Sequence, residues 1–329
     1  MCNHIAGWPP FLRWWVKYYN TDPLSLHIGP APHLEYLSIR GRPTTWLERW
    51  DWFARQPEGR TNSVEKLSKV QLVDVPFLPS SNTFTNLSSL KLGHSNAGIK
   101  ISIDDLFLII SANPNLECLH FIFPLLHEPV LPVDPLTLPN LKSLALEGTS
   151  GLLEIMEFLT APNVEYVAVV VIPDADDDVY RAFEDFAVRS SWPPINHLVL
   201  DGPLLSASIA FLKELPVLVT LSCGGLELDA VFTALNGPIE TPGLLPCPDL
   251  TSITLVSCQP PQYADIFPSL LHTFVRMRTD KSPLVKAELK SLAIQNTFGM
   301  IRGEVQRWLR SRLATLEIDE VLVILSSVI

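Results

Sequence analysis

A six-residue pattern, Leu-x-x-Leu-x-Leu, recurs along the chain and constrains its fold more than any other feature. Many copies follow directly after Pro-Asn or another proline pair. The eleven copies begin at Leu34, Leu67, Leu87, Leu116, Leu141, Val164, Ile195, Leu218, Leu250, Leu289 and Leu313. Successive starts lie about 28 residues apart on average. Repetition of one unit at this spacing predicts a solenoid, in which each repeat packs on its neighbours.

The positions within the pattern predict its local structure. The apolar fourth and sixth residues alternate with polar residues, so they lie on one side of a short strand. Helical patterns fall between the copies, at residues 104–110, 152–159, 179–188, 206–212, 228–235 and 304–309. This combination indicates an α/β fold of the leucine-rich-repeat kind with about 10–11 irregular repeats. We expect a curved horseshoe, with parallel strands on its concave face and helices on its convex face.

The third, fifth and seventh residues of each copy should face outward from the sheet, and function on a repeat fold lies in such surface side chains. We therefore expect the concave face to bind a protein. Tyr36, Tyr166 and His197 are the expected anchors, because aromatic residues are enriched where partners bind most tightly. The predicted protein-binding residues are Tyr36, Ser38, Arg40, Lys69, Gln71, Lys91, His120, Glu147, Tyr166, His197, Asp201 and Thr220.

Charge and composition limit the classes of partner that the chain is expected to bind. The net charge of −11 argues against general nucleic-acid binding, which needs a positive surface. Residues 273–312 are the exception, with nine Lys or Arg and three acidic residues. This stretch indicates a solvated helix face; the alternative is a docking site for an acidic partner. Five irregularly spaced cysteines favour a reducing compartment, cytoplasmic or nuclear, and no apolar run is long enough for a membrane span.

Catalytic and metal-binding patterns are missing from the sequence, so we expect no enzyme, no cofactor and no metal. The alternating Asp174, Asp176 and Asp178 suggest a calcium loop, but Val179 stands where that loop needs glycine. Cys118 and His120 provide two ligands, and a zinc site needs three or four. The phosphate-loop, nucleophile-elbow and His-Glu-x-x-His patterns are absent.

The N-terminal region has a different composition, because six of the eight tryptophans lie within the first 52 residues. Trp46, Leu47, Trp50 and Phe53 form an apolar helical stripe. This stripe predicts packing over the first repeat; exposure to a partner is the alternative, since exposed aromatic residues mark interfaces. Residues 1–33, which contain three of these tryptophans, are expected to form an aromatic-rich cap, and residues 34–329 the repeat array.

The Pro-Asn-Leu-x-x-Leu-x-Leu copies, with the segment from Phe11 to Ile28, resemble the leucine-rich-repeat region of F-box proteins from mushroom-forming fungi. In that family a tryptophan-containing helix follows the F-box, the repeats hold a substrate, and the F-box binds the linker protein of a cullin–RING ubiquitin ligase. This resemblance implies a substrate-recognition module in which residues 1–33 are a remnant of the region after the F-box.

The F-box itself, which opens on Leu-Pro-x-Glu, is not found in the sequence. Two alternatives explain its absence: the protein is naturally truncated, or the gene model starts too late. The alternative function is a free-standing binding or inhibitor protein with no link to ubiquitination.

Overall fold

The computed structural model of the 329-residue chain describes most of the repeated region. The described residues are 13–17, 34–40, 66–74, 85–93, 101–123, 126–127, 135–148, 151–171, 179–202, 211–225, 228–237, 245–256, 267–279, 287–295 and 303–319. The chain divides into two compact units, unit 1 (Met1–Asn163) and unit 2 (Val164–Ile329). The expected aromatic stripe at residues 46–53 and the acidic residues 174–178 lie outside the described residues.

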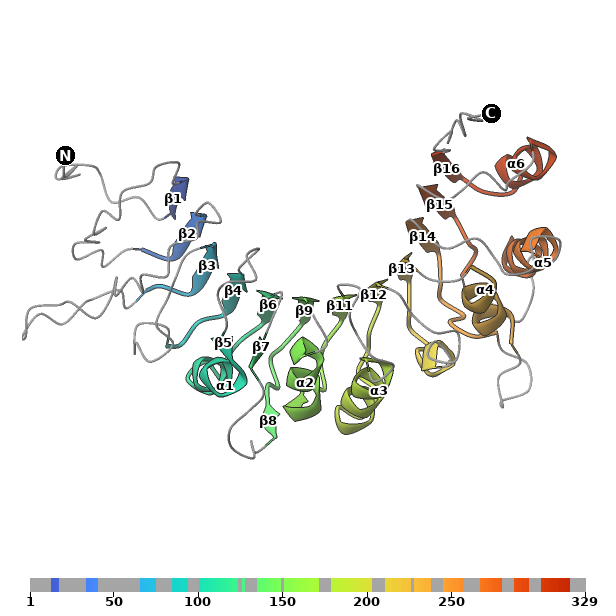
Figure 1. The fold of residues 1–329 in the computed structure, drawn as a ribbon. Coiled ribbons are helices and arrows are strands. Elements are labelled where there is room, and N and C mark those ends of the chain that lie inside the picture. Colours follow the sequence, from blue (N-terminus) through green and yellow to red (C-terminus); the bar gives the residue numbers. More distant parts are fainter. Residues whose placement is uncertain are drawn as a thin grey trace, which may run out of the picture. The chain divides into compact units, whose positions relative to one another are not determined.

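Unit 1 contains six described parallel strands that are hydrogen-bonded in chain order (Figure 1). These strands are β1 (Arg13–Lys17), β2 (Tyr36–Arg40), β3 (Lys69–Val73), β4 (Ser89–Gly93), β6 (Cys118–Phe123) and β9 (Ser143–Gly148). Two helices, α1 (Ile103–Ser111) and α2 (Gly151–Phe158), lie on one side of them. Two short parallel pairs complete the unit: β5 (Ile101–Ser102) with β7 (Leu126–His127), and β8 (Leu136–Thr137) with β10 (Leu159–Thr160).

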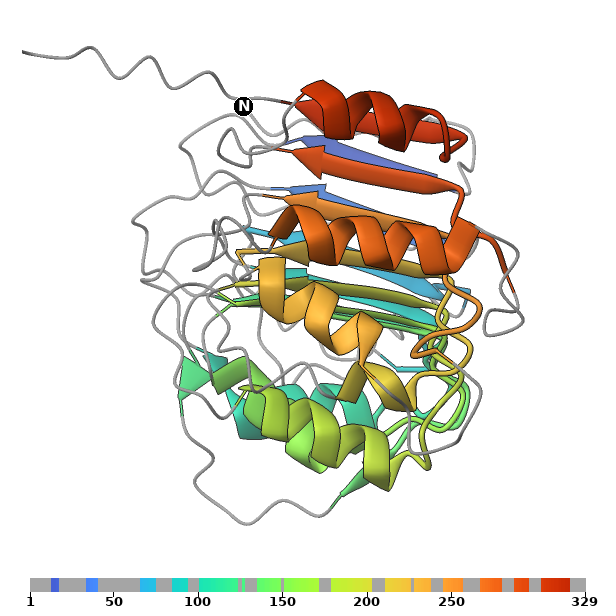
Figure 2. The ribbon, with the colours of Figure 1, turned by 90° about the vertical axis from the view of Figure 1, so that its right-hand side faces the viewer.

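Unit 2 repeats this arrangement, and its described residues include four helices. Its described strands are also parallel and in chain order: β11 (Tyr166–Val171), β12 (His197–Asp201), β13 (Thr220–Gly224), β14 (Ser252–Val256), β15 (Ser291–Gln295) and β16 (Thr315–Asp319). Its helices are α3 (Val179–Arg189), α4 (Leu228–Asn236), α5 (Phe267–Thr279) and α6 (Gly303–Arg310). Figure 2 shows α4, α5 and α6 in front of the strands, and the rings of Phe232 and Phe274 join α4 to α5 at 5.2 Å.

All eleven copies of the leucine pattern form strands, as the sequence predicts, and each of these strands begins at the third residue of its copy. The register is the same from strand to strand, so that Leu90 pairs with Leu119 and Leu92 with Phe121. These side chains have no exposed surface. Their burial is the main source of stability, because it removes apolar surface from water. Each unit is therefore an α/β layer of parallel strands with its apolar face against the helices.

The prolines ahead of the leucine pattern form turns. In four copies the backbone N–H of the first leucine donates to the carbonyl three residues earlier, at 3.1–3.3 Å. Proline is the second residue of each turn, where its fixed φ suits a β-turn. The four turns run from Asn113 to Leu116, Leu138 to Leu141, Leu215 to Leu218 and Cys247 to Leu250. In each of these four copies a turn with proline at its second position thus leads the chain into the next strand.

Five of the six predicted helices are confirmed, as α1, α2, α3, α4 and α6. The sixth, expected at residues 206–212, is described only from residue 211, where residues 211–214 form one short 3-10 turn. Helix α5 was not among these six, although the sequence indicated a helix face within residues 273–312. Its apolar Leu271, Phe274 and Val275 have helical spacing and are buried. Pro268 stands in its first turn, where a proline removes no helical hydrogen bond.

Strand β1 was not predicted either. The resemblance to F-box proteins implies a helix in this segment, whereas Arg13–Lys17 pair with β2 as a parallel strand. The register aligns Trp14 with Leu37 and Val16 with Ile39. The segment from Phe11 is therefore a twelfth copy of the pattern, in which aromatic residues and valine replace the leucines.

Candidate functional site

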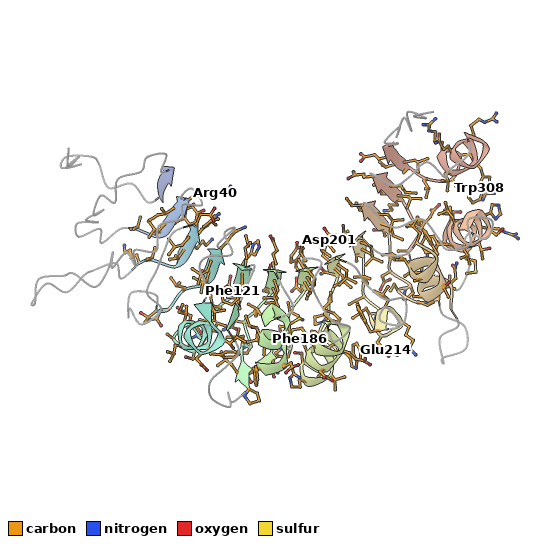
Figure 3. All side chains as sticks on the ribbon, viewed as in Figure 1. Arg40, Phe121, Phe186, Asp201, Glu214 and Trp308 are labelled. Carbon is orange, nitrogen blue, oxygen red and sulfur yellow. The ribbon has the colours of Figure 1, made fainter. Side chains whose placement is uncertain are left out.

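The candidate site is the face of the strands formed by the third, fifth and seventh residues of each leucine pattern, which we call the open face. The helices of each unit lie behind the opposite, leucine-lined face. Figure 3 shows this difference for two labelled residues of unit 1: Arg40 lies on the side away from the helices, and Phe121 lies between its strand and the helices. Each unit has its own open face, and the two are described in turn.

The open face of unit 1 brings together eight of the predicted binding residues. They come from consecutive strands β2, β3, β4, β6 and β9, because the repeat places equivalent residues opposite each other in register. Arg40 and Lys69 are exposed, while the other residues of the set except Ser38 are half-buried between their neighbours. These eight residues are Tyr36, Ser38, Arg40, Lys69, Gln71, Lys91, His120 and Glu147.

Two residues near β2 are less available to a partner than the sequence suggests. The Tyr36 hydroxyl donates a hydrogen bond to Oε1 of Gln71 at 3.2 Å, which holds both side chains along the sheet. Ser38 is only 6% exposed. Its short side chain lies between Tyr36 and Arg40 on its own strand and opposite Gln71 on the next strand. The longer neighbours therefore form the surface here, and Ser38 lies beneath it.

A row of three polar residues, Lys91, His120 and Glu147, crosses β4, β6 and β9. Nε2 of His120 lies 2.7 Å from Oε1 of Glu147, and Lys91 is aligned with His120 on the adjacent strand. The hydrogen bond from His120 lowers the pKa of Glu147, partial burial opposes this shift, and the charges of His120 and Lys91 lower the pKa further. Glu147 is thus a stable carboxylate, held in place by a donor on the next strand.

The open face of unit 2 carries the other four predicted residues. Tyr166, His197 and Asp201 are exposed, and Thr220 is half-buried. They lie on β11, β12 and β13, where Tyr166 is opposite His197 and His197 is opposite Thr220. Nδ1 of His197 also lies 2.7 Å from Oδ1 of its neighbour Asn196. An aromatic ring, an imidazole and a hydroxyl therefore form a row across these three strands.

The basic stretch at 273–312 is not one solvated face, which corrects the sequence interpretation at Arg278. Arg276, Arg307, Arg310 and Arg312 are exposed, but Arg278 is only 1% exposed.

The guanidinium of Arg278 donates to the carbonyl oxygens of Cys247, at 2.8 Å, and of Pro246, and its Cζ lies 5.0 Å from the ring centre of Phe274. Burial lowers its pKa to about 10. Arg278 therefore anchors the turn before β14 and is not available for docking.

The described His, Cys, Asp and Glu side chains are the groups from which a metal site could form. Among these residues, no group of three or more His, Cys, Asp or Glu side chains has the arrangement of a metal site. Cys118 is half-buried on the open face of unit 1, two residues from His120. Cys247 is buried in unit 2, where burial raises the pKa of its thiol to about 12, so it stays protonated. None of the described helices has the length and apolar character needed to cross a membrane.

The sequence identified the individual residues of the open faces but missed how they are connected. The contact between His120 and Glu147 joins the fifth residue of one copy to the seventh residue of the next. Superposing the copies on one another would have placed these residues on adjacent strands. Asn113 was also missed: its side chain accepts from the backbone N–H of Leu87 at 2.8 Å and donates to the carbonyl of Ile109 at 2.7 Å.

Comparison with known proteins adds no family to this description, because no protein-family model and no curated protein matches the chain. The open faces themselves are suited to recognition through hydrogen bonds and charge. They present hydroxyl, amide, imidazole, ammonium, guanidinium and carboxylate groups at regular spacing on a rigid sheet. Such spacing is set by the distance of about 4.8 Å between neighbouring strands.

Proposed function

We propose that the chain is a leucine-rich-repeat solenoid that binds a protein partner on its open faces and catalyses no reaction. One observation carries this proposal: the repeated leucine pattern forms parallel strands in constant register, and most of the residues left outward are polar. A repeat architecture of this kind places its binding residues on an extended surface rather than in a pocket. We infer a cytoplasmic or nuclear location from the cysteine usage.

Within this proposal, the resemblance to F-box proteins favours a substrate-recognition part of a ubiquitin-ligase adaptor. In that case the open faces hold the substrate, and the linker protein of a cullin–RING ligase associates with the same polypeptide. The alternative is a free-standing binding or inhibitor protein. The observation that favours the alternative is β1: residues 13–17 continue the sheet, where the resemblance implies a helix next to a docking module.

Affinity purification of the tagged full-length chain from extracts of its source cells, followed by mass spectrometry, tests the proposal. Recovery of the ligase linker protein supports the adaptor function. Reproducible recovery of other proteins without the linker supports the alternative. Failure to recover any partner specifically would contradict protein binding.

Matched variants then identify the binding face. Tyr36→Ala with Tyr166→Ala should reduce recovery of a genuine partner, because both residues lie on open faces. Leu108→Ala with Val188→Ala removes two exposed apolar side chains, 60% and 56% exposed, from the helices α1 and α3. These control changes should leave recovery unchanged. If both pairs of changes reduced recovery of the partner equally, the assignment of binding to the open faces would be contradicted.

A further inference from the structure

The open face of unit 1 is positively charged, although the whole chain carries a net charge of −11. Among the residues of this face whose side chains the structure describes, three are cations, Arg40, Lys69 and Lys91, and one is a carboxylate, Glu147. Among the residues of the unit 2 open face whose side chains are described, Asp201 and Glu317 are carboxylates and none is a lysine or arginine. The three cations with described side chains lie on β2, β3 and β4.

The single carboxylate of this face does not cancel its charge. Glu147 lies on β9, two strands away from β4, and its Oε1 is 2.7 Å from Nε2 of His120. The hydrogen bond from His120 keeps the carboxylate in place, and the pKa of Glu147 is lowered by this contact and by Lys91. The negative charge of Glu147 therefore offsets part of the positive charge of Lys91. Arg40 and Lys69 lie farther away, on β2 and β3, and keep their positive charge uncompensated by Glu147.

The three cations are close enough to contact one bound segment. The register places Lys69 opposite Tyr36 on one side and Ser89 on the other, and Lys91 opposite Gln71. With about 4.8 Å between strands and about 3.3 Å per residue along a strand, the three positions lie within about 15 Å of one another. Uncharged hydrogen-bonding side chains, including those of Gln71 and Ser89, occupy the space between the cations.

We propose that the open face of unit 1 binds an acidic, extended segment of a partner protein. This inference rests on the proposed protein-binding function and specifies the chemistry of the partner. An extended segment with acidic alternate residues presents carboxylates about 7 Å apart on one side, and every second one about 14 Å apart. The first distance is close to the separation of about 8 Å between Lys69 and Lys91, and the second to that of about 14 Å between Lys69 and Arg40. A nucleic acid is less favoured, because it needs a broad positive surface and the chain as a whole is acidic.

Fluorescence anisotropy with the full-length chain tests this inference directly. The probe is a labelled peptide of about twelve residues in which glutamate and serine alternate. A lysine–serine peptide of equal length and a single-stranded oligonucleotide are the comparison probes. We expect the glutamate peptide to bind, the lysine peptide not to bind, and the affinity to fall as salt is raised, because exposed charges are screened.

Charge reversal then locates the binding surface. Arg40→Glu with Lys69→Glu should lower the affinity for the glutamate peptide by about tenfold or more. The matched control, Lys213→Glu with Arg310→Glu, makes the same change in net charge at two exposed residues of unit 2. The control should change the affinity by less than about twofold. Arg40→Ala with Lys69→Ala provides a milder pair should the reversed pair fail to fold, and circular dichroism reports folding.

Three results would overturn the inference: no binding of the glutamate peptide, equal or tighter binding of the oligonucleotide, or equal loss in the two reversal pairs. The proposed function is separable from it. A partner that is captured by the intact chain and equally well by the Arg40→Glu, Lys69→Glu variant leaves protein binding in place and rejects the acidic-segment inference. Absence of any captured partner rejects the proposed function itself.

Discussion

Unit 1 and unit 2 build the same layer of parallel strands from the same leucine pattern, yet they differ in two respects. The described open face of unit 1 is cationic, and that of unit 2 is acidic. The turns before the strands are also anchored differently, by the neutral amide of Asn113 in unit 1 and by the guanidinium of Arg278 in unit 2. The comparison shows that the leucine positions determine the layer, while the remaining positions are free to determine charge and local anchoring.

The largest effect is expected at the anchor of unit 2. Arg278→Met should destabilise the protein by about 3 kcal/mol, because the buried carbonyls of Pro246 and Cys247 both lose a charged donor. Chemical denaturation measures the change in the free energy of unfolding. Arg310→Met, at an exposed position of α6, is the control and should change it by less than about 0.5 kcal/mol. Equal values for the two variants would show that Arg278 is not an anchor.

The anchor of unit 1 should have a smaller effect that stays local. Asn113→Ala leaves the backbone N–H of Leu87 without its side-chain acceptor and is expected to destabilise unit 1 by about 2 kcal/mol. In a repeat array each repeat contacts its neighbours only. Hydrogen exchange should therefore become faster in β4 and β6 and stay unchanged in β13 and β14. If hydrogen exchange became equally faster in both units, the effect of Asn113 would not be local, and this result would contradict the prediction.

The turn after a strand offers a third comparison. Gly225 follows β13 with a φ of +68°, and an added Cβ would lie 2.8 Å from the carbonyl oxygen of Gly202. Gly225→Ala should lower the free energy of unfolding by about 1.5 kcal/mol, because alanine is strained at positive φ. In unit 1 the equivalent position is Asp74, with a φ of +56°.

Thermal unfolding monitored by circular dichroism measures the effect at Gly225. Ser222→Ala, a half-buried position on the same strand, is the control and should change stability by less than about 0.5 kcal/mol. A Gly225→Ala variant as stable as this control would mean that the close approach of the two turns is unimportant.

The smallest effect concerns the pH dependence of unit 1. The pKa of Glu147 is lowered in the folded state, so the folded chain keeps this carboxylate ionised where the unfolded chain is already protonated. Its stabilisation is therefore complete above the ordinary carboxyl range near 4.5 and is lost as the pH falls through the lowered pKa.

Glu147→Gln should remove about 0.5 kcal/mol at neutral pH, a small value because the side chain is partly exposed. Denaturation at a series of pH values measures the difference in the free energy of unfolding between this variant and the unchanged protein. This difference should shrink as the pH falls below about 4.5. Asp201→Gln, an exposed position on the open face of unit 2, is the comparison variant. A difference for Glu147→Gln that stays constant with pH would contradict the contact with His120.

Much of the layer of strands was predictable from sequence, because the leucines at the fourth and sixth positions of every copy must be buried on the same face of a strand. All eleven strands begin where the pattern places them. Strand β1 was missed because Trp14 and Val16 replace the leucines there. The buried face of helix α5 was missed because it includes Arg278, and an arginine in a basic stretch is ordinarily exposed.

The candidate site was less predictable. The pattern indicates which side chains face outward, but exposure depends on the length of the neighbouring side chains, as the burial of Ser38 shows. Contacts between copies depend on the register of adjacent strands, and single copies contain no such information. The contact of His120 with Glu147 and the buried bonds of Asn113 and Arg278 belong to this class.

The most direct test of the central claim, that the open face of unit 1 binds an acidic segment, is the rate at which a maleimide labels Cys118. This thiol is half-buried on that face, whereas Cys223 and Cys247 are fully buried. Cys2→Ser and Cys258→Ser remove the other two thiols, and Ser252→Cys on β14 places a second reporter on the open face of unit 2. The account predicts that the glutamate peptide slows the labelling of Cys118 and leaves that of residue 252 unchanged. Unchanged labelling of Cys118, or equal protection of both thiols, would contradict it.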